Sequence, residues 1–323
     1  MEIISNPSQV EIKRAAQELK DGHLVAFPTE TVYGLGADAT NEKAVSRVYS
    51  VKGRPNDHPL IVHISSINEL DKWAVDIPEY AIKLAEEFWP GPMTLILNRG
   101  YIAKDFITGA QDSIGLRVPN HVLALSLINE FEKLGGIGIA APSANRFGAL
   151  SPTSAEAVED ELGNYLHSED LILDGGQSKI GVESTIIGCS KAYPVILRPG
   201  AITIEMVENV TGIKTPVNLE KNDTRASGLL EAHYSPKAKV LINELVKPGD
   251  GFIAAQDIKT PKGAIRLSSP ETIEQYANDL YRALRSGDQK MLKRIVVIPP
   301  AGEGLASAIR DRLYKAAAGY STL

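Results

Sequence analysis

The sequence contains a single cysteine, Cys189, among its 323 residues. A disulfide framework or a cysteine-based zinc site within one chain is therefore excluded. Basic residues are not in excess, since the net charge is −6 and the isoelectric point about 5.6, and aromatic residues make up only 6%. This balance disfavours a broad nucleic-acid-binding surface, although a local basic cleft is compatible with it.

Long apolar runs are missing too. No uninterrupted apolar segment approaches the length that spans a membrane, and the first residues lack the basic-then-apolar layout of a signal peptide. We therefore expect a cytoplasmic protein without membrane contact. The sequence also lacks G-x-x-x-x-G-K-[ST], H-E-x-x-H and G-x-S-x-G, and no serine or cysteine shows a local nucleophile signature. These absences argue against a covalent nucleophile.

The composition, 43% apolar and 23% charged, is that of a globular protein long enough for two domains. Short apolar or β-branched runs are interspersed with stretches of helical periodicity. Because strands outnumber helices in the second half of this region, some neighbouring strands must be antiparallel, which predicts a mixed α/β sheet. Helices are expected at 8–20, 41–51, 78–88, 120–133 and 154–162, and strands at 23–27, 59–64, 93–98, 113–118, 136–141, 171–174, 184–189 and 195–198.

A second unit follows a polar stretch that begins near Thr211. The segment "GIKTPVNLEKNDTRASG" has few large apolar residues and is typical of a linker. Beyond "HYSP" (233–236), alternating strands and helices predict a small parallel sheet. We expect strands at 239–242, 252–255 and 295–298 and helices at 271–286 and 304–317, with domain limits of 1–212, 213–236 (linker) and 237–323.

The stretch "FPTETVYGLGADA" (27–39) places hydroxyl side chains between an apolar run and a glycine pair. Its "GLGADA" is expected to open a helix. Gly34, Gly36 and Ala39 satisfy the G-x-G-x-x-G/A spacing of a dinucleotide-binding turn. However, six residues separate the strand from Gly34, and the candidate acidic partner Asp57 lies in a proline-flanked loop. A glycine turn that packs a strand against a helix is the simpler alternative, but it does not explain the hydroxyl cluster.

Two cations flank a glycine in "SVKGRPNDHPL". Lys52 supplies a point charge and Arg54 a planar fork, a pair that suits a polyphosphate. The alternative is a solvated helix C-terminus, where cations are favoured in any case. Two further arginines, Arg117 and Arg198, end predicted strands directly before a proline, where a carboxylate or phosphate would explain them.

Polar side chains also collect after the predicted strand 136–141. Ser143 and Asn145 follow Pro142, and Ser151 precedes a helix; these are ordinary turn and N-cap residues, but α/β sheets often bind ligands at such strand ends. His63 alternates out of phase with its apolar neighbours, and a structural histidine is the competing interpretation. Cys189, on an apolar strand, is expected in the core.

In this order, "FPTETVYGLGA", Lys52-x-Arg54 followed by "PL", "PSAN", "GVEST" and "LRPG" resemble the YrdC-like family of threonylcarbamoyl-AMP synthases over about residues 8–210. The tail after "HYSP" resembles the two-domain branch, which carries an H-Y-x-P element and a small Rossmann-like domain. The resemblance implies a twisted mixed sheet with a wide concave face. It also implies that the chain makes threonylcarbamoyl-adenylate and pyrophosphate from L-threonine, bicarbonate and ATP, for transfer by a threonylcarbamoyl transferase complex to a tRNA adenosine.

The resemblance also implies roles for individual residues. Lys52 and Arg54 would be the catalytic cations and would face the ATP phosphates with His58. Mg²⁺ would accompany ATP, because no carboxylate cluster in the sequence identifies a dedicated metal site. The threonine pocket would comprise Thr31, His63, Arg117, Ala141 and Ser184, and the nucleotide site would add Ser113, Ser143, Asn145, Ser151, Arg198 and Tyr234, with Tyr33 packed nearby.

The chain departs from the family pattern in the linker, where Ser227-Gly228 replaces proline-glycine and Glu231 replaces a basic residue. Contacts between this linker and the nucleotide are therefore in doubt, and direct tRNA binding is left open. Two other functions are compatible with such a fold. An RNA-binding module would need a basic surface flanked by aromatic residues. Transfer from carbamoyl phosphate usually requires an acylphosphatase-like or zinc-finger region, and one cysteine excludes the zinc finger.

Overall fold

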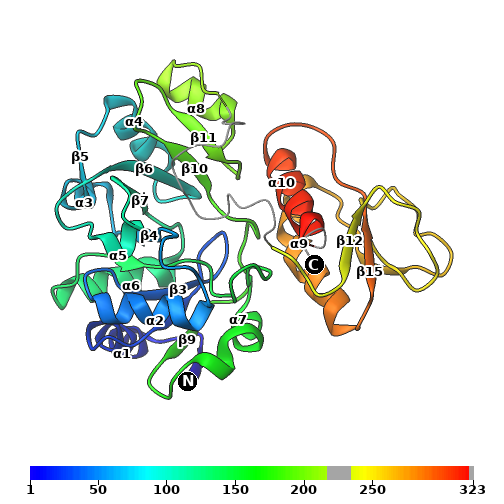
Figure 1. The fold of residues 1–323 in the computed structure, drawn as a ribbon, viewed down its shortest axis with the longest axis horizontal. Coiled ribbons are helices and arrows are strands. Elements are labelled where there is room, and N and C mark those ends of the chain that lie inside the picture. The colour runs from blue at the N-terminus through cyan, green and yellow to red at the C-terminus, as the bar shows by residue number, and fades with distance from the viewer. Residues whose placement is uncertain (217–233, 320–323) are drawn as a thin grey trace.

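The computed structural model describes residues 1–216 and 234–319. In the first range eleven strands form one sheet, and in the second range four strands form another (Figure 1). The larger sheet contains both parallel and antiparallel pairs, whereas all pairs of the smaller sheet are parallel. The predicted α/β class, with a mixed sheet and a second parallel sheet, is confirmed.

The larger sheet has the order β1-β9-β2-β3-β8-β4-β7-β6-β10-β11, with β5 paired to β6. β4 and β7 run parallel, so their carboxyl ends lie side by side and His63 is in register with Arg117. The strands are β1 (Glu2–Ser5), β2 (Val25–Phe27), β3 (Gly34–Asp38), β4 (Ile61–His63), β5 (Ala74–Val75), β6 (Met93–Arg99), β7 (Ser113–Arg117), β8 (Ile139–Ala140), β9 (Leu171–Asp174), β10 (Thr185–Gly188) and β11 (Val195–Arg198).

Helices cover both faces of this sheet. Because side chains alternate along a strand, Val25 and Phe27 pack with α1 and α6 on one face, while Ala26 belongs to the core beneath α2 and α4 on the other. The helical segments of this region are α1 (Gln9–Lys20), α2 (Glu42–Lys52), η1 (Ile67–Glu69), α3 (Leu70–Trp73), α4 (Glu79–Phe88), α5 (Asp105–Thr108), α6 (Val122–Lys133), α7 (Ala155–Leu162), η2 (Gly163–Tyr165) and α8 (Ile204–Thr211).

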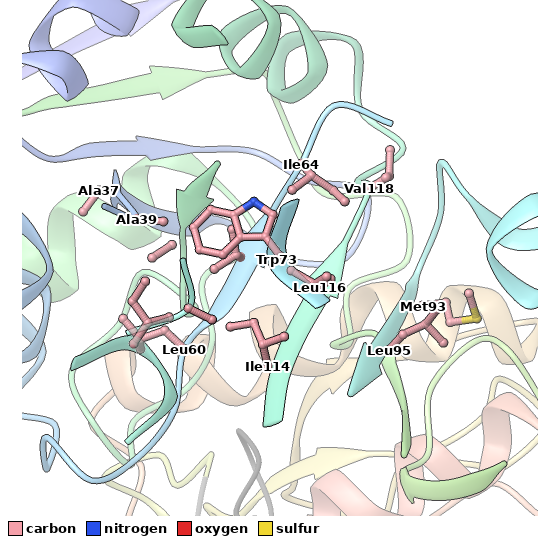
Figure 2. Packing of buried hydrophobic residues seen from close by; sticks show 14 of the residues in the cluster. Ala37, Ala39, Leu60, Ile64, Trp73, Met93, Leu95, Ile114, Leu116 and Val118 are labelled. Carbon is pink, nitrogen blue, oxygen red and sulfur yellow. The ribbon is translucent and has the colours of Figure 1, made fainter. Parts of the chain in front are cut away.

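Trp73 anchors the larger core. Its side chain is fully buried, and its indole nitrogen donates a hydrogen bond to the carbonyl oxygen of Ile137 at 3.1 Å. Its neighbours include Ile64, directly after β4, and Leu116 of β7 (Figure 2). The hydrogen bond satisfies the one polar atom of a side chain that otherwise contributes only apolar area.

The expectation that "GLGADA" opens a helix is wrong, because Gly34–Asp38 forms strand β3, antiparallel to β2. The glycines are required by packing: a Cβ on Gly36 would lie 2.8 Å from Cε1 of Phe27 and 2.9 Å from Cγ2 of Ile139. A strand with small side chains lacks the alternation by which strands are detected. The hydroxyl stretch 28–33 is consequently the connection between two antiparallel strands.

The smaller sheet has the order β12-β15-β13-β14. Its helices cover one face, and Phe252 and Val296 pack beneath loops on the other. The core under the helices also includes Val32, Leu150 and Val182 of the larger unit, so the two units share a hydrophobic cluster. The elements are β12 (Lys239–Ile242), β13 (Gly251–Ile253), β14 (Ile265–Ser268), α9 (Ile273–Gln289), β15 (Arg294–Val297) and α10 (Leu305–Ala318).

The predicted domain limits stay a prediction. The two sheets fall on either side of the expected linker, but most of that linker, including Ser227, Gly228 and Glu231, lies outside the described residues. In the described part of the chain, every helix is too short or too polar to cross a bilayer.

Candidate active site

A pocket lies where the β2–β3 connection meets the ends of β4, β7, β8 and β11. The parallel pairing of β4 with β7 brings the carboxyl ends of both strands, and so His63 and Arg117, to its wall. All five residues predicted to bind threonine line this pocket, as do three of the predicted nucleotide residues. The lining comprises Thr29, Thr31, Val32, Tyr33, Gly34, Ile61, His63, Arg117, Ala141, Pro142, Ser143, Glu183, Ser184, Arg198 and Tyr234.

The guanidinium of Arg117 is held by a carboxylate that the sequence analysis missed. Nη2 of Arg117 lies 2.8 Å from Oε1 of Glu30, and both side chains are about 6% exposed. Oε2 of Glu30 accepts a hydrogen bond from the backbone N–H of Asn120 at 3.1 Å. A buried arginine fixed at one edge by a carboxylate can present its remaining donors to an anion. The only signal in the sequence was an acidic residue between two threonines.

Two buried polar atoms at this wall, Nε of Arg117 and Nδ1 of His63, have neither a hydrogen-bond partner nor an ion-pair partner among the described residues. Burial, reinforced by the positive charge of Arg117, lowers the pKa of His63 to about 3, so the imidazole is neutral at physiological pH. Buried polar groups normally have partners. The pocket is therefore built to receive a polar ligand, with an anionic group on Arg117.

Hydroxyl groups form the rest of the threonine side. Oγ1 of Thr31 lies 2.8 Å from Oγ1 of Thr29, whose hydroxyl also donates to the carbonyl oxygen of Val32 at 2.6 Å. Oγ of Ser184 lies 2.8 Å from Oγ1 of Thr94, another residue that the sequence analysis missed. Arg198 donates to both the carbonyl oxygen and the hydroxyl of Ser184, at 3.0 and 3.2 Å. The hydroxyl of Ser184 is thus oriented from two sides.

Lys52 does not line the pocket. Its Nζ is buried and donates to the carbonyl oxygens of Ser143 and Asn145, at 2.5 and 2.6 Å. Burial, helped by the charge of Arg54, lowers the pKa of Lys52 well below its ordinary value. Lys52 therefore holds the "PSAN" turn against α2, and its predicted role at a phosphate stays a prediction.

Arg54 and His58 lie together in the following loop. Nη2 of Arg54 donates to the carbonyl oxygen of Pro59 at 2.9 Å, and its guanidinium lies 5.8 Å from the ring of Phe147. His58 meets the same ring edge-on at 5.3 Å. Burial lowers the pKa of Arg54 to about 10, which leaves it charged at neutral pH. The loop thus offers one buried cation.

The remaining predicted nucleotide residues are spread more widely. Ser113 begins β7 and Arg117 ends it, so they are separated by about 13 Å at the usual rise per residue. Oγ of Ser151 donates to Glu183 at 2.5 Å. Tyr234, the first residue after the undescribed segment, lines the pocket, and burial raises its pKa to about 12. All residues predicted to bind threonine therefore line the pocket, whereas some of the residues predicted to bind the nucleotide lie outside it.

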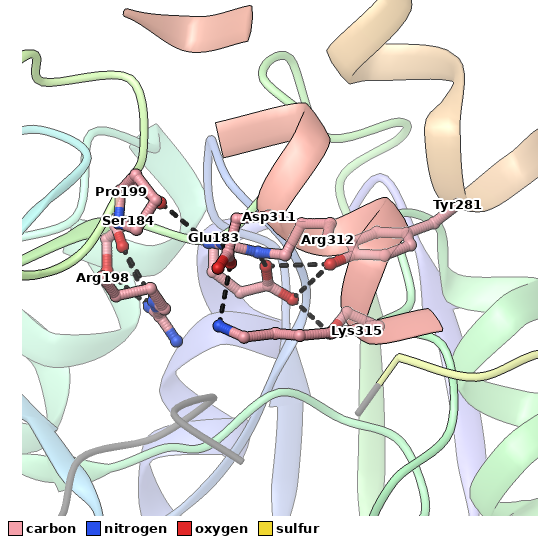
Figure 3. A network of polar contacts seen from close by, with 9 residues as sticks. Glu183, Ser184, Arg198, Pro199, Tyr281, Asp311, Arg312 and Lys315 are labelled. Carbon is pink, nitrogen blue, oxygen red and sulfur yellow. Dashed lines mark hydrogen bonds and ion pairs between the residues drawn. The ribbon is translucent and has the colours of Figure 1, made fainter. Parts of the chain in front are cut away.

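Glu183 was also missed, although it belongs to "GVEST". Its carboxylate is buried and contacts the hydroxyl of Tyr281 and Nε of Arg312, both from the smaller unit (Figure 3). Burial opposes the charge of Glu183, but Arg312 and Arg198 outweigh this effect and hold its pKa at about 2. The only signal of this contact in the sequence is that Arg312 lies on the apolar face of a predicted helix.

A resident metal does not fit the donor set. Among the described residues no three His, Cys, Asp or Glu side chains are grouped as metal ligands. The two carboxylates nearest the pocket, Glu30 and Glu183, are already paired with Arg117 and Arg312. The wall of the pocket is therefore cationic and hydroxylic, suited to anions.

Comparison with known proteins places this site in a family. Residues 17–200 match a family model described as telomere recombination, and residues 202–318 match the C-terminal domain of threonylcarbamoyl-AMP synthase. The threonylcarbamoyl-AMP synthase of Pyrococcus abyssi is 40% identical over 328 aligned positions, which cover 96% of this chain and 94% of that protein. The synthase of Bacillus subtilis is 40% identical over 344 positions, covering 98% of this chain and 95% of the relative.

A solved structure agrees over both units. The crystal structure of P. abyssi Sua5 complexed with L-threonine has a TM-score of 0.88 and 37% identity, with 99% of this chain and 98% of the other covered. The described residues of both sheets therefore have counterparts in one known protein. The chain belongs to the threonylcarbamoyl-AMP synthase family.

Proposed function

We infer that the chain is an L-threonylcarbamoyladenylate synthase, which joins L-threonine, bicarbonate and ATP into threonylcarbamoyl-AMP and pyrophosphate for N6-threonylcarbamoyladenosine modification of tRNA. The observation that carries this inference is the buried guanidinium of Arg117, fixed by Glu30 and left with an unpartnered Nε at the pocket. An amino-acid carboxylate is the complementary ligand.

In this pocket we assign the threonine carboxylate to Arg117. Thr31 and Ser184 offer hydroxyls to the amine and the side-chain hydroxyl, and the backbone near Ala141 closes the wall. The low pKa of His63 keeps its ring neutral, so it contacts the amino acid as a hydrogen-bonding group rather than as a second cation. The structure of the P. abyssi relative holds L-threonine, which supports this substrate.

We assign the nucleotide to the adjoining cationic side. Arg54, His58 and Lys52 contact the phosphates, and the residues that carry the rest of ATP are Ser113, Ser143, Asn145, Ser151, Arg198 and Tyr234. A polyphosphate beside Lys52 favours its charged form and so opposes the effect of burial on its pKa. Mg²⁺ enters as part of the ATP substrate and neutralises phosphate charge there.

The reaction needs positioning more than side-chain chemistry. The threonine amine attacks bicarbonate, and loss of water leaves a carbamate. A carbamate oxygen then attacks the α-phosphorus of ATP, and the bond to the β-phosphate oxygen breaks to release pyrophosphate. Arg117 fixes the threonine while the cations of the loop stabilise the charge that develops on the phosphates. This mechanism explains why the site contains cations and hydroxyl groups but no covalent nucleophile.

Threonylcarbamoyl-AMP is a mixed anhydride, so the enzyme that consumes it must transfer the threonylcarbamoyl group to the tRNA adenosine. We propose that the product passes to a tRNA-modifying threonylcarbamoyl transferase complex. The reaction and its acceptor belong to the cytoplasm, where we place the enzyme.

The decisive experiment measures pyrophosphate release from ATP with and without L-threonine and bicarbonate. Release that requires both co-substrates is the expected result. Release without threonine, or none despite ATP binding, would overturn the assignment and favour carbamoyl transfer or RNA binding instead.

A matched pair of variants ties the activity to the pocket. Arg117→Ala should abolish threonine-dependent release, because the carboxylate loses its partner. Arg99→Ala is the control: Arg99 is also ion-paired to carboxylates, Asp105 and Asp112, but does not line the pocket. Equal rates for the two variants would contradict the assignment of the carboxylate.

A further inference from the structure

Two residues of the smaller unit contact the carboxylate of Glu183 in the larger unit. Both of its carboxylate oxygens accept from the hydroxyl of Tyr281, at 3.0 and 2.9 Å, and Oε2 accepts from Nε of Arg312 at 2.6 Å. Tyr281 lies on α9 and Arg312 on α10, and the side chain of Arg312 is fully buried (Figure 3). The smaller unit therefore supplies the counter-charge for a buried carboxylate of the larger one.

The same arginine reaches a second segment of the pocket wall. Nη2 of Arg312 donates to the carbonyl oxygen of Pro199 at 3.1 Å, and Pro199 directly follows Arg198. Glu183 directly precedes Ser184, whose carbonyl oxygen and hydroxyl both bind Arg198. One guanidinium thus bridges Glu183, directly before Ser184, and Pro199, directly after the end of β11 at Arg198.

We propose that Arg312 and Tyr281 are positioning residues for threonylcarbamoyl-AMP synthesis: from the smaller unit they fix Glu183 and Pro199, and so set the Ser184–Arg198 wall of the threonine pocket. This inference rests on the proposed function. It assigns the C-terminal unit a role in substrate affinity and gives neither residue a contact with substrate.

The charges around Glu183 determine what happens without Arg312. Facing the carboxylate are Arg312 and Tyr281 from the smaller unit, Tyr234 from the segment between the sheets, and Arg198 and Ser151 from the larger unit. Arg198 is the other cation that holds the pKa of Glu183 low, whereas Lys315, in the same network, is ion-paired to Asp311. Once Arg312 is removed, Glu183 either takes up a proton or draws Arg198 away from Ser184. Either response disturbs the wall on which the substrate rests.

One other polar contact between the units involves no residue that lines the pocket. Nδ2 of Asn278, on α9, donates to the carbonyl oxygens of Ser178 and Lys179 at 2.7 and 2.9 Å, and neither of these residues lines the pocket. Asn278 therefore provides a control that weakens the interface without touching Glu183. A merely adhesive role for Arg312 would make its variants behave like this control.

The test compares full-length Arg312→Gln, Tyr281→Phe and Asn278→Ala with wild type. L-threonine binding is measured by calorimetry, and KM and kcat by pyrophosphate release. We expect threonine affinity to fall on the order of tenfold in Arg312→Gln, as a coupling of about 1.4 kcal/mol would produce, less in Tyr281→Phe, and not at all in Asn278→Ala. Unchanged threonine affinity in both Arg312→Gln and Tyr281→Phe would overturn the proposal.

Two further measurements separate positioning from folding. Arg312→Gln should introduce a step in the pH dependence of threonine affinity between about pH 4.5 and 7 that is missing in wild type, because Glu183 then titrates in this range. In a Glu183→Gln background, Arg312→Gln should lower threonine affinity only slightly further. If Arg312→Gln fails to fold, Arg312→Lys and Tyr281→Phe decide the outcome. Calorimetric threonine binding by wild type keeps this test separate from the turnover assay of the proposed function.

Discussion

Replacing Gly181 with alanine should wedge the two units apart without changing any side chain of the pocket. Gly181 has φ +83°, and a Cβ there would lie 2.5 Å from Cα of Asn278 and 2.6 Å from the carbonyl oxygen of Ala277. These are backbone atoms of α9, so no rotamer change relieves the overlap. The hydrogen bonds of Asn278 to Ser178 and Lys179 also resist withdrawal of the helix.

The cost has two parts. A left-handed backbone costs alanine about 1–2 kcal/mol, and overpacking against α9 adds about 1–3 kcal/mol. Gly135→Ala isolates the first part, because Gly135 has φ +80° and nothing within 4 Å of its added Cβ. The Tm of Gly181→Ala should therefore lie about 2–10 °C below that of Gly135→Ala.

Thermal unfolding by calorimetry and KM for L-threonine are the two readouts. Gly181→Ala should also raise KM for L-threonine, because Glu183 and Ser184 follow two and three residues later in the chain, whereas Gly135→Ala should not. Equal Tm and equal KM in the two variants would refute the reasoning that α9 is held rigidly against this loop.

Three more predictions concern single residues. Lys52→Ala and Arg54→Ala should each lower pyrophosphate release about a hundredfold or more, since each removes a buried basic side chain from the region where we propose that the phosphates bind, and unchanged rates in both would rule out that assignment. Trp73→Ala should lower the free energy of unfolding by about 3–5 kcal/mol in urea titrations; a loss below about 1 kcal/mol would contradict its central place in the core. The pKa of Glu183 in the folded protein, about 2, lies below the ordinary 4.5. The ionised carboxylate therefore contributes about 3 kcal/mol to the free energy of unfolding above pH 4.5, and this contribution is lost as the pH falls toward 2. Glu183→Gln should accordingly unfold with a shallower pH dependence over that range, and an unchanged slope would count against the ion pair with Arg312.

The sequence predicted those elements whose side chains repeat with a clear period. The helix expected at 8–20 is α1 (Gln9–Lys20), which repeats buried apolar residues at a helical spacing, and the run 93–98 is β6 (Met93–Arg99), a short stretch of mostly apolar residues. Strand β3 was missed because glycine and alanine give no alternation. The edge strand β1 and the strand β14 were missed as well, since each contains only two apolar residues.

The residues of the site also divide into those that the sequence could predict and those that it could not. Residues in ordered motifs, such as Arg117 and Ser184, could be assigned by resemblance and lie together at one pocket. Glu30 and Glu183 could not be assigned, because a carboxylate acquires its role from a partner brought close by the fold. The partner of Glu183, Arg312, is 129 residues away in sequence. A contact between residues so far apart in the chain leaves no local pattern in the sequence.

The edge of the larger sheet has a consequence for the order of assembly during synthesis. β1 pairs with β9, with Glu2 opposite Leu171, so β1 leaves the ribosome about 170 residues before its partner strand. At the usual rate of about 5–20 residues per second, that interval is on the order of ten seconds or more. Until β9 emerges, the N-terminal strand is an unpaired edge on a growing chain, and the first half of this sheet can close only after the chain beyond residue 174 has been made.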